Sequence, residues 1–195
     1  MTTPAAGKVT WSFTASLDGF IAGPGHDMSW LAAAGEADPD VLAELAARVG
    51  VIISGRRGYD AAMAQAGERD ELTAEAYGGA WQGIEFVLTH RPQELADDPA
   101  VTAMNCDIRE AVARARKLAG GREVQIISAD IARQALEHDL IDELRMFTAP
   151  IFLGDGTRVF SVPGGRRVHW ERVDSGEDPE RFGTVYRPRV GSGRM

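Results

Sequence analysis

The sequence predicts an α/β fold with a mostly parallel central sheet, helices on both faces and an antiparallel hairpin at the C-terminal end. Short apolar segments alternate along the chain with stretches of helical periodicity, an order typical of parallel strands joined by helices. The last two apolar segments, 168–174 and 184–189, frame a polar tip and indicate a hairpin. We expect one domain over residues 1–190, with a disordered tail over 191–195.

The composition excludes several classes of function. The net charge of -8 argues against a nucleic-acid or anionic-membrane partner, because either would need a basic surface. Cys106 is the one cysteine, so neither an internal disulfide nor a cysteine zinc site is expected, and the four histidines lack metal-ligand spacing. Residues 1–8 hold no long apolar stretch, so we expect no signal peptide or membrane span and a cytoplasmic location.

The first half of the chain supplies two strands and two helices. Residues 9–17 alternate bulky and small side chains and predict the first strand, while the glycines and proline of 18–29 predict a mobile loop. Asp38 precedes a helix with an apolar stripe. Residues 50–55 are apolar enough for a buried strand that ends on glycine, with a helix from Tyr59.

The second half repeats this alternation. Asp107 is an expected N-cap, and the Gly-Gly pair that follows the helix is the expected stop. The predicted elements are a polar loop or short helix (68–83), a strand (86–89), a helix (107–119), a strand (124–127), a helix (129–138) and a strand (143–152) that runs into a hairpin turn at Gly154, Asp155 and Gly156.

Open α/β sheets bind ligands at the carboxyl ends of their strands, and two such ends carry suitable residues. Gly55-Arg56-Arg57-Gly58 joins a strand to a helix, and backbone N–H groups with two guanidinium groups suit a pyrophosphate. The alternative is a tight turn with surface arginines. Thr89-His90-Arg91 offers a hydroxyl and a cation for a ribose 2′-phosphate, or else forms a solvated turn before Pro92.

Three segments carry a likeness to a known family: Ser16–Pro24, Gly55–Tyr59 and 126–156. In sequence, order and approximate spacing they resemble the dihydrofolate-reductase-like family, above all the reductase domain of riboflavin biosynthesis (the RibD C-terminal domain) and its stand-alone bacterial relatives. The resemblance implies an NADPH-dependent oxidoreductase that transfers a hydride to a small heterocyclic or carbonyl substrate. It also implies a homodimer, for which the apolar stretch Leu144–Leu153 is a candidate contact.

The resemblance assigns the cofactor residues. The nicotinamide would lie near Ile21 and Ala22, the phosphates near Gly55–Gly58 and Ser128–Ile131, and the 2′-phosphate at Arg91. The family usually has two adjacent glycines where this chain has Ser128 and Ala129, and Asp130 adds a negative charge beside them. Asp130 is equally a helix-start residue. This departure leaves open a shifted cofactor position, a flavin in place of NADPH, or a lost activity.

The same resemblance suggests the catalytic residues. Asp18 stands in the family's Ser-Leu-Asp-Gly segment near the ligand cleft, and Trp30 matches a tryptophan beside the substrate pocket, although core packing explains Trp30 equally well. A proton donor is also required, and Glu36, Asp38 and Asp40 are the carboxyls near the expected position. Asp38, which precedes Pro39, is more simply an N-cap.

Two functions of different classes therefore remain. The first is the reductase, of which reduction of the riboflavin-pathway pyrimidine is a narrower version that the phosphate on that substrate disfavours. The chain has no His-x-Glu with Cys-x-x-Cys, so it lacks the zinc deaminase that often accompanies this reductase. The second is a non-catalytic module that binds a flavin or another ligand on the same fold.

Overall fold

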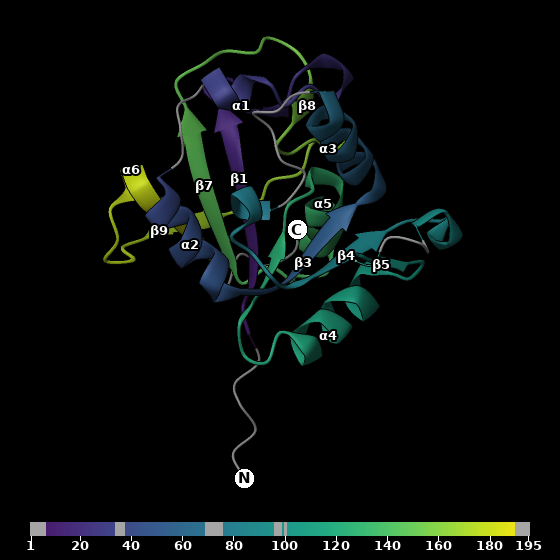
Figure 1. Cartoon of the computed structure of the whole chain (residues 1–195). Helices are drawn as coiled ribbons and strands as arrows, with labels where there is room; N and C mark the ends of the chain where they lie inside the picture. Colours follow the sequence, from purple (N-terminus) through teal and green to yellow (C-terminus); the bar gives the residue numbers. More distant parts are fainter. Residues whose placement is uncertain (1–6, 34–37, 69–75, 96–98, 100, 190–195) are drawn as a thin grey trace.

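The computed structural model describes residues 7–33, 38–68, 76–95, 99 and 101–189, and the statements below concern these residues. The strands of the main sheet are β1 (Val9–Ser16), β3 (Val49–Gly55), β4 (Ile84–Leu88), β5 (Val101–Met104), β6 (Glu123–Ile126), β7 (Glu143–Ala149), β9 (Trp170–Val173) and β10 (Thr184–Pro188). Their order is β5-β4-β3-β6-β1-β7-β10-β9 (Figure 1). The first six are parallel, and β10 is antiparallel to β7 and β9, as predicted.

Helices cover both faces of the sheet. The main helices are α2 (Pro39–Arg48), α3 (Arg56–Glu68), α4 (Ile108–Leu118) and α5 (Ala129–Glu137), with short helices α1 (Trp30–Ala33) and α6 (Pro179–Phe182). The connections that contain α2 and α3 run toward the β5 edge, and those that contain α4 and α5 run the other way. Because such crossovers are right-handed, α2 and α3 lie on one face and α4 and α5 on the other.

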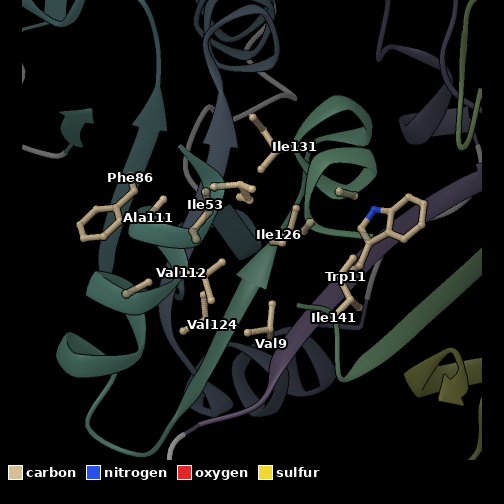
Figure 2. Packing of buried hydrophobic residues seen from close by; sticks show 14 of the residues in the cluster. Val9, Trp11, Ile53, Phe86, Ala111, Val112, Val124, Ile126, Ile131 and Ile141 are labelled. Atoms are coloured by element: carbon tan, nitrogen blue, oxygen red, sulfur yellow. The ribbon is translucent and has the colours of Figure 1, made fainter. Parts of the chain in front are cut away.

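The hydrophobic core lies between the sheet and helices α4 and α5. Alternate residues of β1, from Val9 and Trp11 to Phe13 and Ala15, belong to it with residues of β3, β4 and β6. Figure 2 shows Ala111 and Val112 of α4 and Ile131 of α5 packed toward these strands. The long apolar segments seen in the sequence therefore build one continuous core.

The face under α2 and α3 is different, because several of its buried side chains are polar. Thr10, Ser54, Gln125, Glu143 and Arg145 are all buried, and alternation along the strands places them on this face. Gln125 pairs with Thr10 of β1, which in turn pairs with Glu143 of β7. Buried polar groups are informative because they are uncommon, and this row sets the face apart from the core.

The predicted helix ends are confirmed. The Asp38 carboxylate accepts a hydrogen bond from the Asp40 N–H and caps α2, and the Asp107 carboxylate accepts from the Glu110 N–H and caps α4. Gly120 and Gly121 follow α4 with positive φ angles of 61° and 89°, a conformation that glycine adopts without strain. The helix expected from Tyr59 begins earlier, at Arg56.

The predicted hairpin at Gly154, Asp155 and Gly156 is wrong. Strand β7 ends at Ala149, before Pro150, and the turn leads to β8 (Thr157–Arg158), which pairs with β2 (Phe20–Ala22). A Cβ atom on Gly156 would lie 2.0 Å from the Ala22 carbonyl oxygen, so only glycine permits this approach. The loop expected over residues 18–29 thus includes a strand.

Strand β7 is an interior strand. It pairs with β1 from Thr10 to Ser16 on one side and with β10 from Thr184 to Tyr186 on the other. Its first half therefore has no free edge for a second subunit, and the homodimer remains a prediction. The expected disordered tail, 191–195, lies outside the described residues, and no helix in the described part is long and apolar enough to cross a membrane.

The close contact of β3 with α4 gives a test of the packing. A Cβ atom on Gly50 would lie 2.8 Å from the Cα and carbonyl oxygen of Ala119, and these backbone atoms cannot rotate away. We expect Gly50→Ala to lower the free energy of unfolding by about 1–3 kcal/mol. Gly58→Ala is the control, because no atom lies within 4 Å of its Cβ position. In helix α3 it should raise stability by about 0.5–1 kcal/mol, and equal effects in urea denaturation would contradict the packing.

Candidate functional site

The strand order marks one place at the carboxyl edge of the sheet as the expected binding crevice. The chain leaves β3 toward β4 and leaves β6 toward β7, in opposite directions, although β3 and β6 are neighbours. Ligands of open α/β sheets bind where the connections diverge in this way. The residues at this point are Gly55, at the end of β3, and Ile127 and Ser128, which follow β6.

The two segments approach each other closely at this point. The Ile127 N–H donates to the Ile53 carbonyl at 3.3 Å. A Cβ atom on Gly55 would lie 3.1 Å from Ser128 Oγ and 3.3 Å from Ile131 Cγ1. The absence of a side chain at Gly55 therefore makes room for the Ser128 hydroxymethyl group, at a position where the resembled family usually has glycine.

The start of α5 has free backbone donors. Ser128 is the N-cap residue but makes no side-chain capping bond, whereas aspartates cap α2, α4 and α6. The first N–H groups of a helix need an acceptor and favour an anion. The Asp130 carboxylate is bound by Arg133 at 3.0 Å and by Gln134 at 2.9 Å. Its charge is thus neutralised along the helix.

The predicted phosphate-binding arginines differ in their availability. Arg56 pairs with Asp60 at 2.7 Å and with Glu94 at 3.0 Å, and the bond to Asp60 raises the pKa of Arg56. Arg91, 69% exposed, also pairs with Glu94, at 2.9 Å. Arg57 is exposed and forms no ion pair within the described residues. It is the guanidinium most free to bind an anion.

Thr89 and His90 complete this edge of the sheet. Thr89 follows β4, its Oγ1 accepts a hydrogen bond from the Arg91 N–H at 3.1 Å, and its own N–H donates to the Met104 carbonyl. The His90 side chain is exposed. These hydrogen bonds fix the turn after β4, and Arg91 lies at the surface there.

Asp18 fastens two loops together. Its carboxylate accepts hydrogen bonds from the Ser16 hydroxyl at 2.6 Å and from the N–H groups of Leu153 and Gly154 at 3.1 and 2.7 Å. These donors, the Ser16 hydroxyl first, lower the pKa of Asp18 to about 2. The group is ionised at neutral pH, so the geometry favours an anchor for the loop that carries Ile21 over the catalytic role suggested by the sequence.

Ile21 and Ala22 lie in β2, which the β8 pairing holds. Ala22 is buried and Ile21 is half-buried against the core. The segment that follows β2 is closed into a turn by a hydrogen bond of 2.8 Å from the Gly23 N–H to the Asp27 carbonyl. The loop expected to cover the nicotinamide is therefore tied at both ends.

Trp30 is buried, with 5% of its surface exposed, and its indole N–H has no partner in the described chain. It lies outside the cluster under α4 and α5. Asp38 caps α2 and pairs with Arg181 at 2.7 Å, and this pairing lowers the pKa of Asp38. Asp40 is exposed in the first turn of α2, and Glu36 lies outside the described residues.

The sequence reasoning missed three residues on the polar face. Ile127 is a large apolar side chain that is 40% exposed at the divergence of the strands. The hydroxyl of Tyr77, in the 3-10 turn η2 (Ala76–Gly79), donates to Gln125 Oε1. Burial raises the pKa of Tyr77 to about 12, so the phenol stays protonated. No local pattern links Tyr77 to β6, whereas Ile127 could have been found from its position after the strand.

Two cavities among the described residues lie elsewhere. They measure about 310 and 270 Å³ and share Val173, Asp174, Ser175, Glu177 and Val185, near β9 and β10. The smaller one also touches Arg48 and Arg145, which both pair with Glu177. Because the charged side chains that line the smaller cavity are already paired with one another, we place the candidate site at the divergence of β3 and β6 instead. The described residues contain no cluster suited to a metal ion.

Comparison with known proteins agrees with this geometry. The family model for the RibD C-terminal domain matches residues 7–182, while no curated protein matches the chain. A Shewanella protein named for riboflavin biosynthesis superposes with a TM-score of 0.69 and 24% identity, over 93% of this chain and 99% of the other.

Two further structures share the fold. The pyrimidine deaminase/reductase of Thermotoga maritima has a TM-score of 0.63 and 13% identity, and this chain, 94% covered, spans 57% of it. Dihydrofolate reductase of Enterococcus faecalis, crystallised with NADP(H), has a TM-score of 0.57 and 16% identity, over 94% of this chain and 97% of the other. The fold predicted from the sequence is confirmed.

The Asp18 contacts predict a pH-dependent contribution to stability. A carboxylate whose pKa is lowered on folding stabilises the fold above its unfolded pKa, and this contribution is lost as the pH falls through the folded value, here about 2. Asp18→Asn should therefore lower the melting temperature at pH 7 and at pH 4, with the difference from the wild type vanishing toward pH 2. Asp139→Asn is the control: Asp139 is exposed with φ 52°, which asparagine tolerates. Equal melting temperatures for Asp18→Asn and wild type at pH 7 would refute the anchor.

Proposed function

Because the chain belongs to the RibD C-terminal domain family, a family of reductases with the dihydrofolate-reductase fold, we propose that it is an NADPH-dependent reductase of a small heterocyclic or carbonyl compound. The observation that carries the proposal is the uncapped start of α5 beside Gly55, at the divergence of β3 and β6. A dinucleotide pyrophosphate is an anion of the kind that such a helix start favours.

The residues around this point fit the cofactor. The N–H groups at the start of α5 and the Arg57 guanidinium would hold the pyrophosphate, with the Ser128 hydroxyl as a further donor. Asp130 does not oppose binding, because Arg133 neutralises it. Thr89, His90 and Arg91 would hold the 2′-phosphate. Arg56 would lie between the pyrophosphate and the 2′-phosphate, because its partner Glu94 also binds Arg91. NADPH, when bound, supplies the hydride.

The opposite end of the cofactor would lie at the loop of Ile21 and Ala22. Asp18 and the β2–β8 pairing hold this loop in place, so it excludes water from hydride transfer. The substrate would lie on the α2 side of the sheet, where the Trp30 indole N–H is buried and unpaired. That donor suits a substrate oxygen or a water molecule bound to it.

The proton required by the reduction would come from water. The pKa values of Asp18 and Asp38 are both lowered, so neither carboxyl is protonated near neutral pH. A water molecule held by Trp30 can deliver a proton to the substrate without a carboxylic acid.

Calorimetric titration with NADPH, with NADH as the control, tests the proposal. A dissociation constant near 1 μM, or about -8 kcal/mol, would support it. If neither nucleotide gives a heat of binding and a flavin does bind, the alternative is favoured: a ligand-binding module in which Ser128 and Ala129 block the nicotinamide cofactor.

The arginines should contribute separately to cofactor binding. Arg57→Ala removes a cation from the pyrophosphate and should weaken NADPH and NADH alike, by about tenfold for one charge-assisted bond. Arg91→Ala should weaken NADPH by a similar factor and leave NADH unchanged. Arg109→Ala, an exposed arginine on α4 that pairs with Asp107, should change neither. Equal losses of NADPH and NADH in Arg91→Ala would show that Arg91 does not bind the 2′-phosphate.

The indole of Trp30 should matter to substrate rather than to cofactor. Trp30→Phe keeps an aromatic ring but removes the N–H, and we expect kcat/KM to fall about tenfold with NADPH binding unchanged. Because the indole N–H has no partner among the described residues, its removal should cost little stability. Full activity of Trp30→Phe in a steady-state assay of NADPH oxidation would assign Trp30 to packing alone.

A further inference from the structure

One carboxylate lies between two of the arginines at the carboxyl edge of the sheet. Glu94 Oε1 is 2.9 Å from Arg91 Nη1, and Glu94 Oε2 is 3.0 Å from Arg56 Nη1. Each oxygen of the carboxylate therefore faces a different guanidinium group. Arg56 follows β3 and Arg91 follows β4, and these strands are parallel neighbours. Because neighbouring strands lie about 4.8 Å apart, one small anion is able to contact both side chains.

The backbone around Glu94 is fixed, but its side chain is accessible. Glu94 belongs to the 3-10 turn η3 (Pro92–Leu95), its N–H donates to the Arg91 carbonyl at 3.2 Å, and Leu95 is buried. The Glu94 side chain is 35% exposed. Its carboxylate can therefore leave the two arginines by side-chain rotation into solvent, without any change in the turn.

The charges at this place cancel in the free protein. Arg56 pairs with Asp60 as well as with Glu94, at 2.7 Å through its Nε atom. Two guanidinium groups thus face two carboxylates. A phosphate monoester carries close to two negative charges near neutral pH, and beside Glu94 it would meet a like charge. While Glu94 stays between the arginines, the site favours an uncharged group.

The arginines are nevertheless weakly satisfied by Glu94. Arg56 Nη1 is buried and has no hydrogen-bond partner among the described residues, because its approach to Glu94 is not aligned for a hydrogen bond. Buried donors without a partner are uncommon. The pair with Arg91 lies at the surface, where an ion pair contributes little. A phosphate that replaces Glu94 can form charge-assisted bonds with both arginines.

A ribose hydroxyl group would interact with Glu94 in the opposite way. In dinucleotide-binding α/β sheets an acidic side chain accepts a hydrogen bond from the ribose 2′-hydroxyl of NADH, whereas an arginine accommodates the 2′-phosphate of NADPH. This chain has both kinds of residue in direct contact. NADH can therefore bind while Glu94 stays in place, but NADPH cannot.

We propose that Glu94 sets the preference between the two nicotinamide cofactors: its carboxylate lies where the 2′-phosphate binds, leaves Arg56 and Arg91 when NADPH binds, and accepts a hydrogen bond from the 2′-hydroxyl when NADH binds. The inference rests on the proposed function for the identity of the cofactor. It implies that the protein binds NADPH less tightly than its two arginines would permit and that it also accepts NADH.

Three variants separate the role of Glu94 from a general effect of charge. Glu94→Gln keeps the shape of the side chain and removes its charge. Asp60→Asn removes one charge from Arg56 on its Nε side, away from Arg91. Glu110→Gln is a control on α4, where Glu110 pairs with Arg114 at 2.9 Å. NADPH and NADH are titrated into each protein by calorimetry.

Glu94→Gln should tighten NADPH about fivefold, the effect of two competing surface ion pairs, and should weaken NADH about twofold through the altered bond to the 2′-hydroxyl. The preference for NADPH should stay nearly unchanged in Asp60→Asn and unchanged in Glu110→Gln. If Glu94 only orients the arginines, Glu94→Gln should weaken NADPH instead. An unchanged or lower preference for NADPH in Glu94→Gln would overturn the inference.

Inorganic phosphate tests the same residue without a dinucleotide. It is titrated into the wild type and into Glu94→Gln, with sodium chloride of equal ionic strength as the reference, and the guanidinium N–H signals are followed by NMR. The Arg56 and Arg91 signals should respond at a severalfold lower phosphate concentration in the variant, and equal responses would overturn the inference. If this difference is seen but neither nucleotide binds any of the proteins, the proposed function fails and Glu94 remains the resident anion of a phosphate site.

Discussion

The separation of β6 from its neighbour β1 is the constraint on which the candidate site depends. The two strands pair only from Val9 to Trp11 and from Val124 to Ile126, because β6 ends there while β1 continues beside β7 to Ser16. The chain must then turn into α5 directly beside the end of β3, and Gly55 permits the turn by lacking a side chain. Because β6 ends early, the start of α5 is left uncapped, the Ile127 side chain is exposed, and the pairing of β1 with β6 stops at Ile126.

The two faces of the sheet serve different purposes. The face under α4 and α5 is apolar throughout and stabilises the fold by burial. The face under α2 is mixed, because Thr10, Gln125, Glu143 and Arg145 are buried there beside apolar residues such as Ile52. Helix α2 buries Val41, Leu45 and Ala46, and Glu177 adds a polar link by bridging Arg48 of α2 to Arg145 of β7.

The sequence predicted what depends on local pattern. The strands of the main sheet other than β5, the main helices and the caps at Asp38 and Asp107 were found because periodicity and capping are properties of neighbouring residues. The β2–β8 pairing was missed because it depends on a contact between Gly156 and Ala22, which no local pattern reveals. At the site, the charge of Asp130 suggested repulsion of a phosphate. The neutralising Arg133 stands three residues later, a helical spacing that could have been recognised.

The buried indole N–H groups of Trp11 and Trp30 bear on how this fold balances stability and function. Both lack a hydrogen-bond partner in the described chain, and Trp11 belongs to the core under α4 and α5, whereas Trp30 lies outside that cluster. If stability alone had selected these two residues, apolar side chains of similar volume would serve better, because a buried donor without a partner is destabilising. The Trp11 ring packs against Phe13, with ring centroids 4.8 Å apart, so burial of its aromatic surface accounts for its position. Trp30 has no such place in the core, and a ligand that supplies the missing acceptor therefore accounts better for its unpaired N–H.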